Sequence, residues 1–349
     1  MVGFLQRRKC EALLTAIGAR DVAGVRRSLQ AGADPNCTDE NGWPCIAKAV
    51  STGNVDIVKA LLDGRAAVGR KFPALLDERQ RSLYAELCGR GLQVGMPEDS
   101  WSALLEAVSQ GHLSLVTLLL ERGADPNLKH GAKLDPDTYV QQGLMQSMGS
   151  QVGLDPDRKD GWTALMEAAN RGHGEIAEVL LSRNADFRAT TRDGTTALMR
   201  GAAGGHSSCI RVLLASGSPV DQMNSDGWTA LFFASARGHI SAMELLLGHN
   251  ADVNKKNHSN ATPLMWAVRG SPGAVKVLLA HGARVNEVSD KGGSALMAAV
   301  MTRLPDVVQI LLDAGADARI LDKHGTPLVE LARSTFQPKI IEMISAAVG

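Results

Sequence analysis

Apolar residues recur along this chain with a period close to 33 residues. A reference leucine returns first every 33 and then every 32 residues, at Leu165, Leu198, Leu231, Leu264, Leu296 and Leu328. A Leu-Leu pair follows at a nearly constant distance, as at Leu180-Leu181 and Leu213-Leu214. The same pattern recurs upstream around Leu104 and around Ile46. Two apolar segments with helical spacing in each period predict a pair of short helices per repeat.

Residues with a defined conformational role mark the ends of these predicted helices. Thr163 is placed to cap a first helix, because its hydroxyl can accept from the free N–H groups there. Pro263 and Pro327 stand at the next position in other copies, where the missing N–H of proline is not needed. The second helix ends at a residue type that readily adopts the left-handed conformation, at Gly32, Gly91, Gly123, Asn184, Gly217, Asn250, Gly282 and Gly315.

These motifs resemble the ankyrin repeat. The segments DGWTALMEAANRGHGEIAEVLLSRNAD and DGWTALFFASARGHISAMELLLGHNADVN carry the resemblance, which covers roughly residues 10–349. It implies an all-α fold, an ankyrin-repeat solenoid of stacked helix–turn–helix units with projecting hairpin fingers. The family usually has a histidine after the reference leucine, which helps tie neighbouring units together. We expect apolar packing to replace that tie here, because the position holds Met166, Met199, Phe232, Met265 and Met297.

The period divides the chain into consecutive units. We expect an N-terminal capping repeat at 10–38, ankyrin repeats at 39–69 and 98–128, five ankyrin repeats at 159–321 and a C-terminal capping repeat at 322–349. Two spacings, from Ile46 to Leu104 and from Leu104 to Leu165, are nearly two periods long. We therefore interpret 70–97 as a degenerate shortened repeat and 129–158 as a degenerate repeat or insertion. The alternative is two long inserted loops, which compact proteins use sparingly.

Composition and motifs exclude several function classes. Lys+Arg and Asp+Glu both number 37. This balance argues against a nucleic-acid partner, because proteins that bind nucleic acids usually have an excess of basic residues. No aliphatic stretch approaches the 18 residues of a membrane span, so no membrane insertion is expected. The five cysteines lack the spacing of a metal or redox motif and indicate reduced thiols in a cytoplasmic protein. With no phosphate-binding loop or nucleophile elbow, we expect no catalytic residues, metal or cofactor.

Tryptophan gives the clearest functional signal. One repeat position, just after the turn glycine or its equivalent, holds Trp43, Trp101, Trp162 and Trp228. The resemblance places this position on the concave face, and Trp is enriched in binding hot spots; packing on the next finger is the alternative. Because later copies lack the aromatic, we expect the N-terminal two-thirds to form the contact surface. Residues at the helix ends facing the same groove complete the candidate set: Asn170, Arg171, Arg237 and Arg269.

These observations favour a non-enzymatic adaptor or scaffold, monomeric on its own, that binds a protein partner in the concave groove. A fixed structural subunit of a large assembly is the first alternative. An enzyme or small-molecule binder that uses the degenerate units is the second. A further use is as a modification substrate, because the resemblance links the hairpin residues Asn127, Asn254 and Asn286 to asparaginyl hydroxylation.

Overall fold

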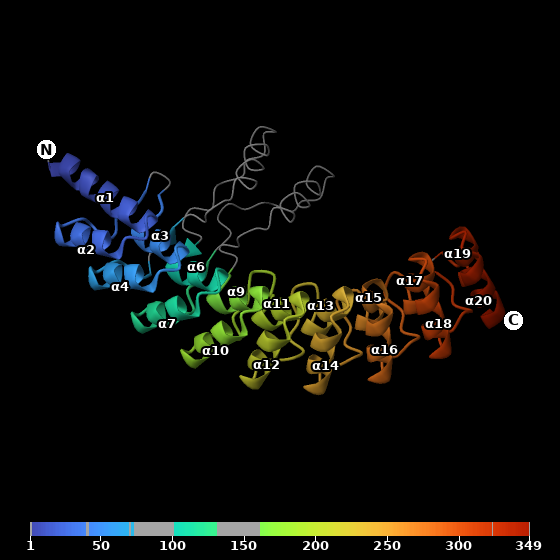
Figure 1. The fold of residues 1–349 in the computed structure, drawn as a ribbon. Coiled ribbons are helices and arrows are strands. Elements are labelled where there is room, and N and C mark those ends of the chain that lie inside the picture. The colour runs from blue at the N-terminus through green and yellow to red at the C-terminus, as the bar shows by residue number, and fades with distance from the viewer. Residues whose placement is uncertain are drawn as a thin grey trace. The chain divides into compact units, whose positions relative to one another are not determined.

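The computed structural model describes residues 2–39, 42–69, 71–72, 101–130, 161–322 and 324–348. Within them the chain folds almost entirely into short α-helices, arranged as consecutive helix–turn–helix pairs (Figure 1). The predicted all-α solenoid with hairpin fingers is confirmed. The chain divides into two compact units, residues 1–168 with 178–186 (unit 1) and residues 169–177 with 187–349 (unit 2).

Within its described residues, unit 1 contains three complete helix pairs and one small pair of strands. The helices are α1 (Val2–Gly18) and α2 (Val22–Gln30), α3 (Cys45–Ser51) and α4 (Val55–Asp63), and α6 (Ala103–Ser109) and α7 (Leu113–Glu121). Strands β1 (Lys71–Phe72) and β2 (Trp101–Ser102) pair antiparallel. The first helices pack on one another in the order α1, α3, α6, and the second helices in the order α2, α4, α7. The unit is therefore two layers of helices deep.

Unit 2 repeats this arrangement. Its helices are α11 (Ala197–Gly204), α12 (Ser207–Ala215), α13 (Ala230–Arg237), α14 (Ile240–Gly248), α15 (Pro263–Gly270), α16 (Pro272–Ala280), α17 (Ala295–Met301), α18 (Pro305–Asp313), α19 (Leu328–Ser334) and α20 (Pro338–Val348). The odd-numbered helices pack on one another and form the inner layer, and the even-numbered helices form the outer layer (Figure 1). The division between the two units runs through α9 (Ala164–Arg171) and α10 (Gly174–Ser182).

The predicted helix boundaries have the expected geometry. The Thr196 hydroxyl accepts from the backbone N–H of Met199 at 3.3 Å, and Ser294 caps α17 in the same way. Asn184 and Asn250 have φ of 63° and 62°, the left-handed region that the pattern Gly-or-Asn predicts. Gly91 lies outside the described residues. Arg65 occupies the same place after α4 with φ of 67°, so this helix end is left-handed even where the residue is neither Gly nor Asn.

Apolar packing at the position after the reference leucine is confirmed for four of the five residues. Met166, Met199, Phe232 and Met297 are buried, whereas Met265 is only half-buried. A polar tie between units is also present, but it comes from a different histidine. His206 and His239 follow a helix-ending glycine, and their Nε2 atoms donate to the carbonyl oxygens of Asn170 and Ala203, one unit earlier, at 3.1 and 3.0 Å.

Two long spacings separate the reference residues of unit 1. The degenerate repeats predicted at 70–97 and 129–158 lie almost wholly outside the described residues. The repeats on either side of each stretch contact one another directly. Helix α3 packs on α6, and Asn127 Nδ2 donates to the carbonyl oxygen of Asn184 at 3.0 Å. The repeats that flank each stretch are therefore neighbours, and the degenerate repeats at 70–97 and 129–158 stay a prediction.

Each stretch is flanked by two residues that pair with one another in a hairpin finger. Phe72 pairs with Trp101 in the β1–β2 ladder, and His130 pairs with Trp162 across an isolated bridge. The shorter finger of the first repeat is closed in the same way by the bridge between Thr38 and Pro44. These pairs show where the two stretches join the described residues, and the choice between a degenerate repeat and an inserted loop stays a prediction.

Candidate functional site

The fingers of unit 2 are built by side-chain-to-backbone hydrogen bonds. Asn224 Oδ1 accepts from the backbone N–H of Trp228 at 2.8 Å, and Asn257 Oδ1 accepts from that of Ala261 at 2.9 Å. Asp322 makes the same bond to Thr326 at 2.8 Å. Asn and Asp favour turns because their side chains can replace a backbone acceptor in this way. The repeat sequence therefore specifies the shape of each finger locally.

Successive fingers are also tied to one another. The backbone N–H of Ser225 donates to the carbonyl oxygen of Asp193 at 2.8 Å, and that of Asp290 donates to Ser259 at 3.0 Å. Lys256 Nζ lies 2.6 Å from Glu287 Oε2 and adds an ion pair between the same two fingers that Asp290 and Ser259 join. The fingers thus form a continuous wall that faces the inner helices. We call the surface between this wall and helices α13, α15 and α17 the binding groove.

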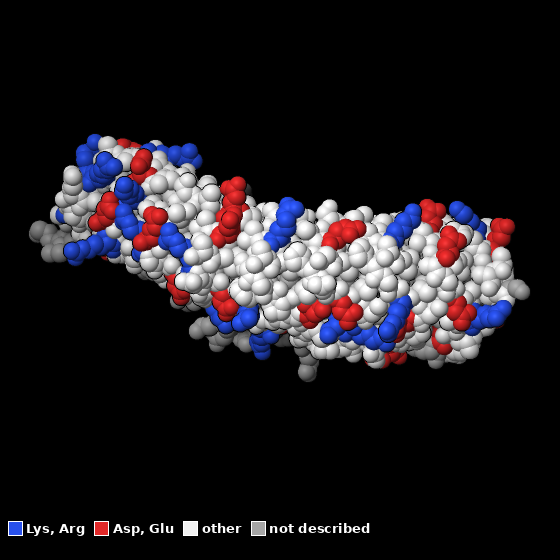
Figure 2. Space-filling view, turned by 90° about the horizontal axis from the view of Figure 1, so that it is seen from below, with Lys and Arg blue, Asp and Glu red and all other residues white. Residues whose placement is uncertain are grey.

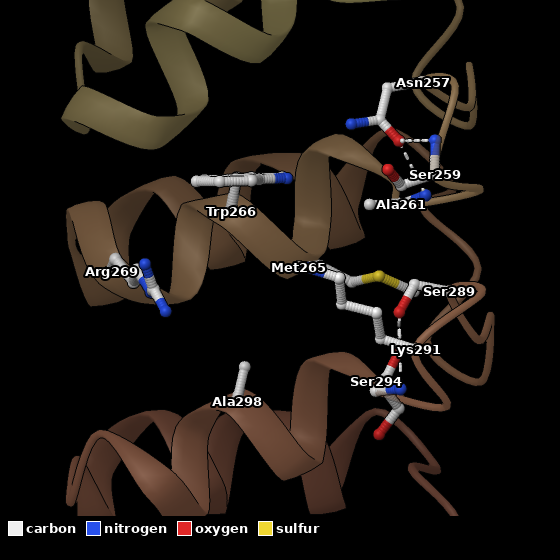
Figure 3. Close-up of a pocket in the computed structure, with 11 residues that line it drawn as sticks. Asn257, Ser259, Ala261, Met265, Trp266, Arg269, Ser289, Lys291, Ser294 and Ala298 are labelled. Atoms are coloured by element: carbon white, nitrogen blue, oxygen red, sulfur yellow. Dashed lines mark hydrogen bonds between the residues drawn. The ribbon is translucent and has the colours of Figure 1, made fainter. Parts of the chain in front are cut away.

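The binding groove contains a hollow of about 220 Å³ between α15 and α17. Helix α15 contributes Met265, Trp266 and Arg269 to its lining, α17 contributes Ala298, and a finger contributes Lys291. Figure 3 shows Met265 and Lys291 at the finger end of the hollow and Arg269 at its opposite end. The lining is therefore apolar in the middle and cationic at both ends.

An aromatic cluster adjoins the hollow. The ring centroids of Trp228 and Trp266 lie 4.6 Å apart in an edge-to-face arrangement, and Trp228 also contacts Phe233 at 5.2 Å and Phe232 at 5.8 Å. The guanidinium carbon of Arg269 lies 5.7 Å from the ring centroid of Trp266, within the range of a cation–π contact. Trp228, Phe233 and Trp266 are half-buried, so part of each ring faces solvent.

The four tryptophans predicted as contact residues occupy two different environments. Trp43, Trp101 and Trp162 are only 3%, 1% and 8% exposed. The indole N–H of Trp101 donates to Glu106 Oε2 at 2.6 Å, and that of Trp162 donates to Glu167 Oε2 at 3.0 Å. Little of these three rings is left for a partner, which favours the packing alternative. Trp228 alone among the four is half-buried, and it lies in unit 2, while a contact surface along the N-terminal two-thirds of the chain stays a prediction.

The predicted helix-end residues are all exposed. Asn170 and Arg171 lie at the end of α9, Arg237 ends α13, and Arg269 stands one residue before the end of α15. The structure brings Arg269 onto the aromatic cluster. It records no contact of Arg237 with that cluster within the described residues.

Sequence reasoning missed Trp266, Phe233 and Lys291. The first two stand two residues after the reference leucines Leu264 and Leu231. In other copies this position holds Glu106, Glu167, Arg200 and Ala298. An aromatic residue in two successive copies of an otherwise polar or small position was a usable signal. Lys291 carried no comparable pattern.

The described residues offer little for covalent or metal chemistry. Burial, reinforced by the neighbouring Cys37 thiol, raises the pKa of Cys10 to about 11, and burial raises the pKa of Cys209 to about 11. Both thiols are therefore protonated at neutral pH and weakly nucleophilic. Within the described part of the chain, no group of three or more His, Cys, Asp or Glu could hold a metal ion. Among the same residues, no helix has the length and hydropathy that crossing a membrane requires.

The hairpin asparagines connect neighbouring units. Asn254 Nδ2 donates to the carbonyl oxygen of Gly282 at 3.1 Å, and its Oδ1 accepts from the backbone N–H of Arg284 at 2.8 Å. Asn286 makes the equivalent pair of bonds to Gly315 and Asp317. These side chains are accounted for by stacking of the units. Hydroxylation of Asn127, Asn254 or Asn286 stays a prediction.

Figure 2 shows one face of the molecule, on which acidic and basic side chains are interspersed without a large patch of one sign. Such a distribution agrees with the equal numbers of acidic and basic residues in the sequence.

Comparison with known proteins gives a consistent result. A family model of ankyrin repeats (three copies) matches residues 13–130, 139–224, 202–289, 232–322 and 270–346. The chain is 36% identical over 103 residues to a putative ankyrin repeat-containing protein of Treponema pallidum (strain Nichols), covering 26% of this chain and 35% of that protein. It is 34% identical over 133 residues to ankyrin repeat, SAM and basic leucine zipper domain-containing protein 1 of Equus caballus. This match covers 38% of this chain and 23% of that protein.

A solved structure shows the same architecture. The human ASB11 ankyrin repeat domain superposes with a TM-score of 0.58 at 25% sequence identity, and the match covers 71% of this chain and 99% of that one. The chain spans about a third or less of the length of the two curated relatives above. The remaining regions of those proteins therefore have no counterpart in the matched residues.

Proposed function

Because the chain belongs to the ankyrin-repeat family, whose repeats are protein–protein interaction modules, we propose that it is a non-enzymatic adaptor or scaffold that binds a protein partner in the binding groove of unit 2. The observation that carries this proposal is the half-exposed aromatic cluster beside a cationic hollow. Trp and Arg are the residue types most enriched in binding hot spots, where they fill desolvated positions at the centre of an interface.

We assign the contact residues from exposure and position. Trp228, Trp266 and Arg269 form the centre, with Lys291 and Arg237 beside it. Trp43, Trp101 and Trp162 support the fold of their own fingers and are not contacts in this proposal. Asn170 and Arg171 are exposed at the end of α9 and remain candidates for the edge of the interface.

The wider features of the proposal rest on composition. Equal numbers of acidic and basic residues support a protein partner over nucleic acid. We also propose that the protein is cytoplasmic and monomeric in the absence of its partner. Free thiols at Cys10, Cys37, Cys45 and Cys209 support the reducing compartment.

Affinity capture with a matched pair of variants tests the groove. The Trp228→Ala/Trp266→Ala variant removes the aromatic cluster, and Trp162→Phe changes a buried tryptophan as a control. We expect a discrete partner to be captured by the wild type and by Trp162→Phe, and its affinity for the double variant to fall at least roughly 30-fold, the equivalent of a hot-spot loss of about 2 kcal/mol. Circular dichroism checks that all three chains are folded. Equal capture by all three would remove the binding groove from the mechanism.

A further inference from the structure

The hollow in the binding groove has an unusual charge pattern. Its charged lining residues, Arg269 and Lys291, are both cations, and no carboxylate lines it. Within the described residues, neither of these cations has an acidic partner within ion-pair distance. Cations on the neighbouring finger segments differ, because Lys256 and Arg284 lie 2.6 and 3.5 Å from the carboxylate oxygens of Glu287. The positive charge of the hollow is therefore not neutralised from within.

The space between the two cations is apolar. Met265, Trp266 and Ala298 contribute side chains to it, and Figure 3 shows Ala298 pointing from α17 toward the hollow, with Ser289 and Ser294 at the finger end beside Lys291. A bound ligand would cover this surface and remove water from around both cations. Charge-assisted hydrogen bonds are strengthened when water is excluded. A ligand that carries carboxylates at its ends and an apolar group between them matches the hollow in charge and in polarity.

We infer that the binding groove recognises an acidic peptide segment of its partner, in which an apolar side chain lies between two carboxylate side chains. The inference rests on the proposed function and specifies the ligand of the same groove. In an extended peptide, alternate side chains face the same side. The simplest sequence that presents acid, apolar and acid groups to one face is therefore Glu-Ser-Leu-Ser-Glu. The apolar side chain would pack on Met265 and Trp266, and the carboxylates would meet Lys291 and Arg269.

The test uses the five tryptophans as internal reporters. The full chain is labelled with ¹⁵N, and its indole N–H signals are assigned with single Trp→Phe variants. Blocked Glu-Ser-Leu-Ser-Glu is titrated against two matched peptides, Gln-Ser-Leu-Ser-Gln and Glu-Ser-Gly-Ser-Glu. We expect the first peptide to shift the Trp266 signal and to leave Trp101 and Trp162, whose indoles donate to Glu106 and Glu167, unchanged. Each matched peptide should bind about 5- to 20-fold more weakly.

Two charge-matched double variants assign the acid preference to the hollow. Arg269→Met/Lys291→Met should abolish the difference between the Glu and Gln peptides. Arg211→Met/Lys276→Met removes the same charge from exposed positions on the outer helices α12 and α16 and should preserve that difference. High salt should weaken the Glu peptide more than the Gln peptide.

The outcomes separate this inference from the proposed function. Equal binding of the Glu and Gln peptides, or no shift of Trp266 by any peptide at millimolar concentration, overturns recognition of an acidic segment. An acid preference that survives in Arg269→Met/Lys291→Met overturns it as well. The groove itself is judged by capture with Trp228→Ala/Trp266→Ala, which does not depend on the charge of the ligand.

Discussion

In unit 1 the indole of Trp101 is buried and donates to the carboxylate of Glu106, whereas in unit 2 the indole of Trp228 is half-buried and packs against Phe233 and Trp266. The two tryptophans occupy the same repeat position. What differs is the residue five positions later, which is Glu106 for Trp101 and Phe233 for Trp228; Trp43, which is also buried, has Lys48 there. A carboxylate satisfies the indole and lets the ring be buried. An aromatic ring instead extends the apolar surface sideways, and that surface reaches solvent.

One repeat position thus holds a buried, structural tryptophan in one repeat and a proposed contact residue in another. Repeat proteins allow this because each unit contacts only its neighbours. A change in the local partner of a residue therefore alters its role without altering the fold.

The largest effect should come from deleting a tryptophan on the stability side of this comparison. Trp101→Ala leaves a large cavity and removes the indole N–H that donates to the Glu106 carboxylate. We expect the free energy of unfolding to fall by about 3–5 kcal/mol. Trp266→Ala should lower it by about 1 kcal/mol, because part of that ring is already in water. Urea denaturation followed by circular dichroism measures both. Equal losses would show that burial does not distinguish the two classes.

A smaller effect should follow from removing the carboxylate partner. Both oxygens of Glu106 are used, since Oε2 accepts from Trp101 Nε1 and Oε1 accepts from Gln110 Nε2 at 3.2 Å. Glu106→Leu leaves a buried indole N–H without this acceptor and should lower the free energy of unfolding by about 1–3 kcal/mol. Glu106→Gln keeps an amide oxygen for the indole and should be milder. If the Leu variant is as stable as the wild type, the Trp–Glu pair does not explain the buried class.

The smallest effect concerns the finger wall of unit 2. A hydrogen bond from Lys256 and its positive charge hold the pKa of Glu287 below its ordinary value of 4.5. A carboxyl with a depressed folded-state pKa stabilises the fold above the unfolded-state pKa, and this stabilisation is lost as the pH falls through the folded value. Lys256→Met should therefore lower the free energy of unfolding near pH 7 by at most about 1 kcal/mol, since the pair is partly exposed.

The pH dependence gives this last prediction its control. The difference between the wild type and Lys256→Met should shrink as the pH falls below 4.5, where Glu287 becomes protonated in both chains. It should also shrink in high salt, because exposed ion pairs are screened. A difference that stays constant from pH 7 to strongly acidic solution would assign the effect to packing of the lysine side chain.

Much of the fold could be predicted from the sequence because each repeat specifies its own caps and helix ends. The capping role of Thr163 and the left-handed ends at Asn184 and Asn250 depend on neighbours within a few residues. The fate of the tryptophans depended on a contact five residues away and on the next unit, which a search for one repeated residue type does not examine. Glu106 and Phe233 both stand five residues after the tryptophan of their repeat. The difference between the two tryptophans could therefore have been predicted from the sequence.

The two long spacings show what the repeat period alone leaves open. Periodicity counts residues along the chain, and an insertion of nearly one period cannot be distinguished from an extra repeat by length alone. Asn127 donates to the carbonyl oxygen of Asn184 and accepts from the backbone N–H of Asp186, and these bonds join residues separated by 57 and 59 positions. Elsewhere the equivalent asparagine contacts span 28 to 31 positions.

The bridge between His130 and Trp162 also bears on how such a chain acquires new sequence. Closing a loop roughly six times longer than the finger between Thr38 and Pro44 adds only about 1.5 kcal/mol of closure entropy, because the cost grows with the logarithm of loop length. The helices before and after the bridge keep their register whatever the length of the segment between His130 and Trp162. Finger tips are thus natural grafting points, at which evolution or an engineer can attach a segment of arbitrary length without redesigning the helices beneath.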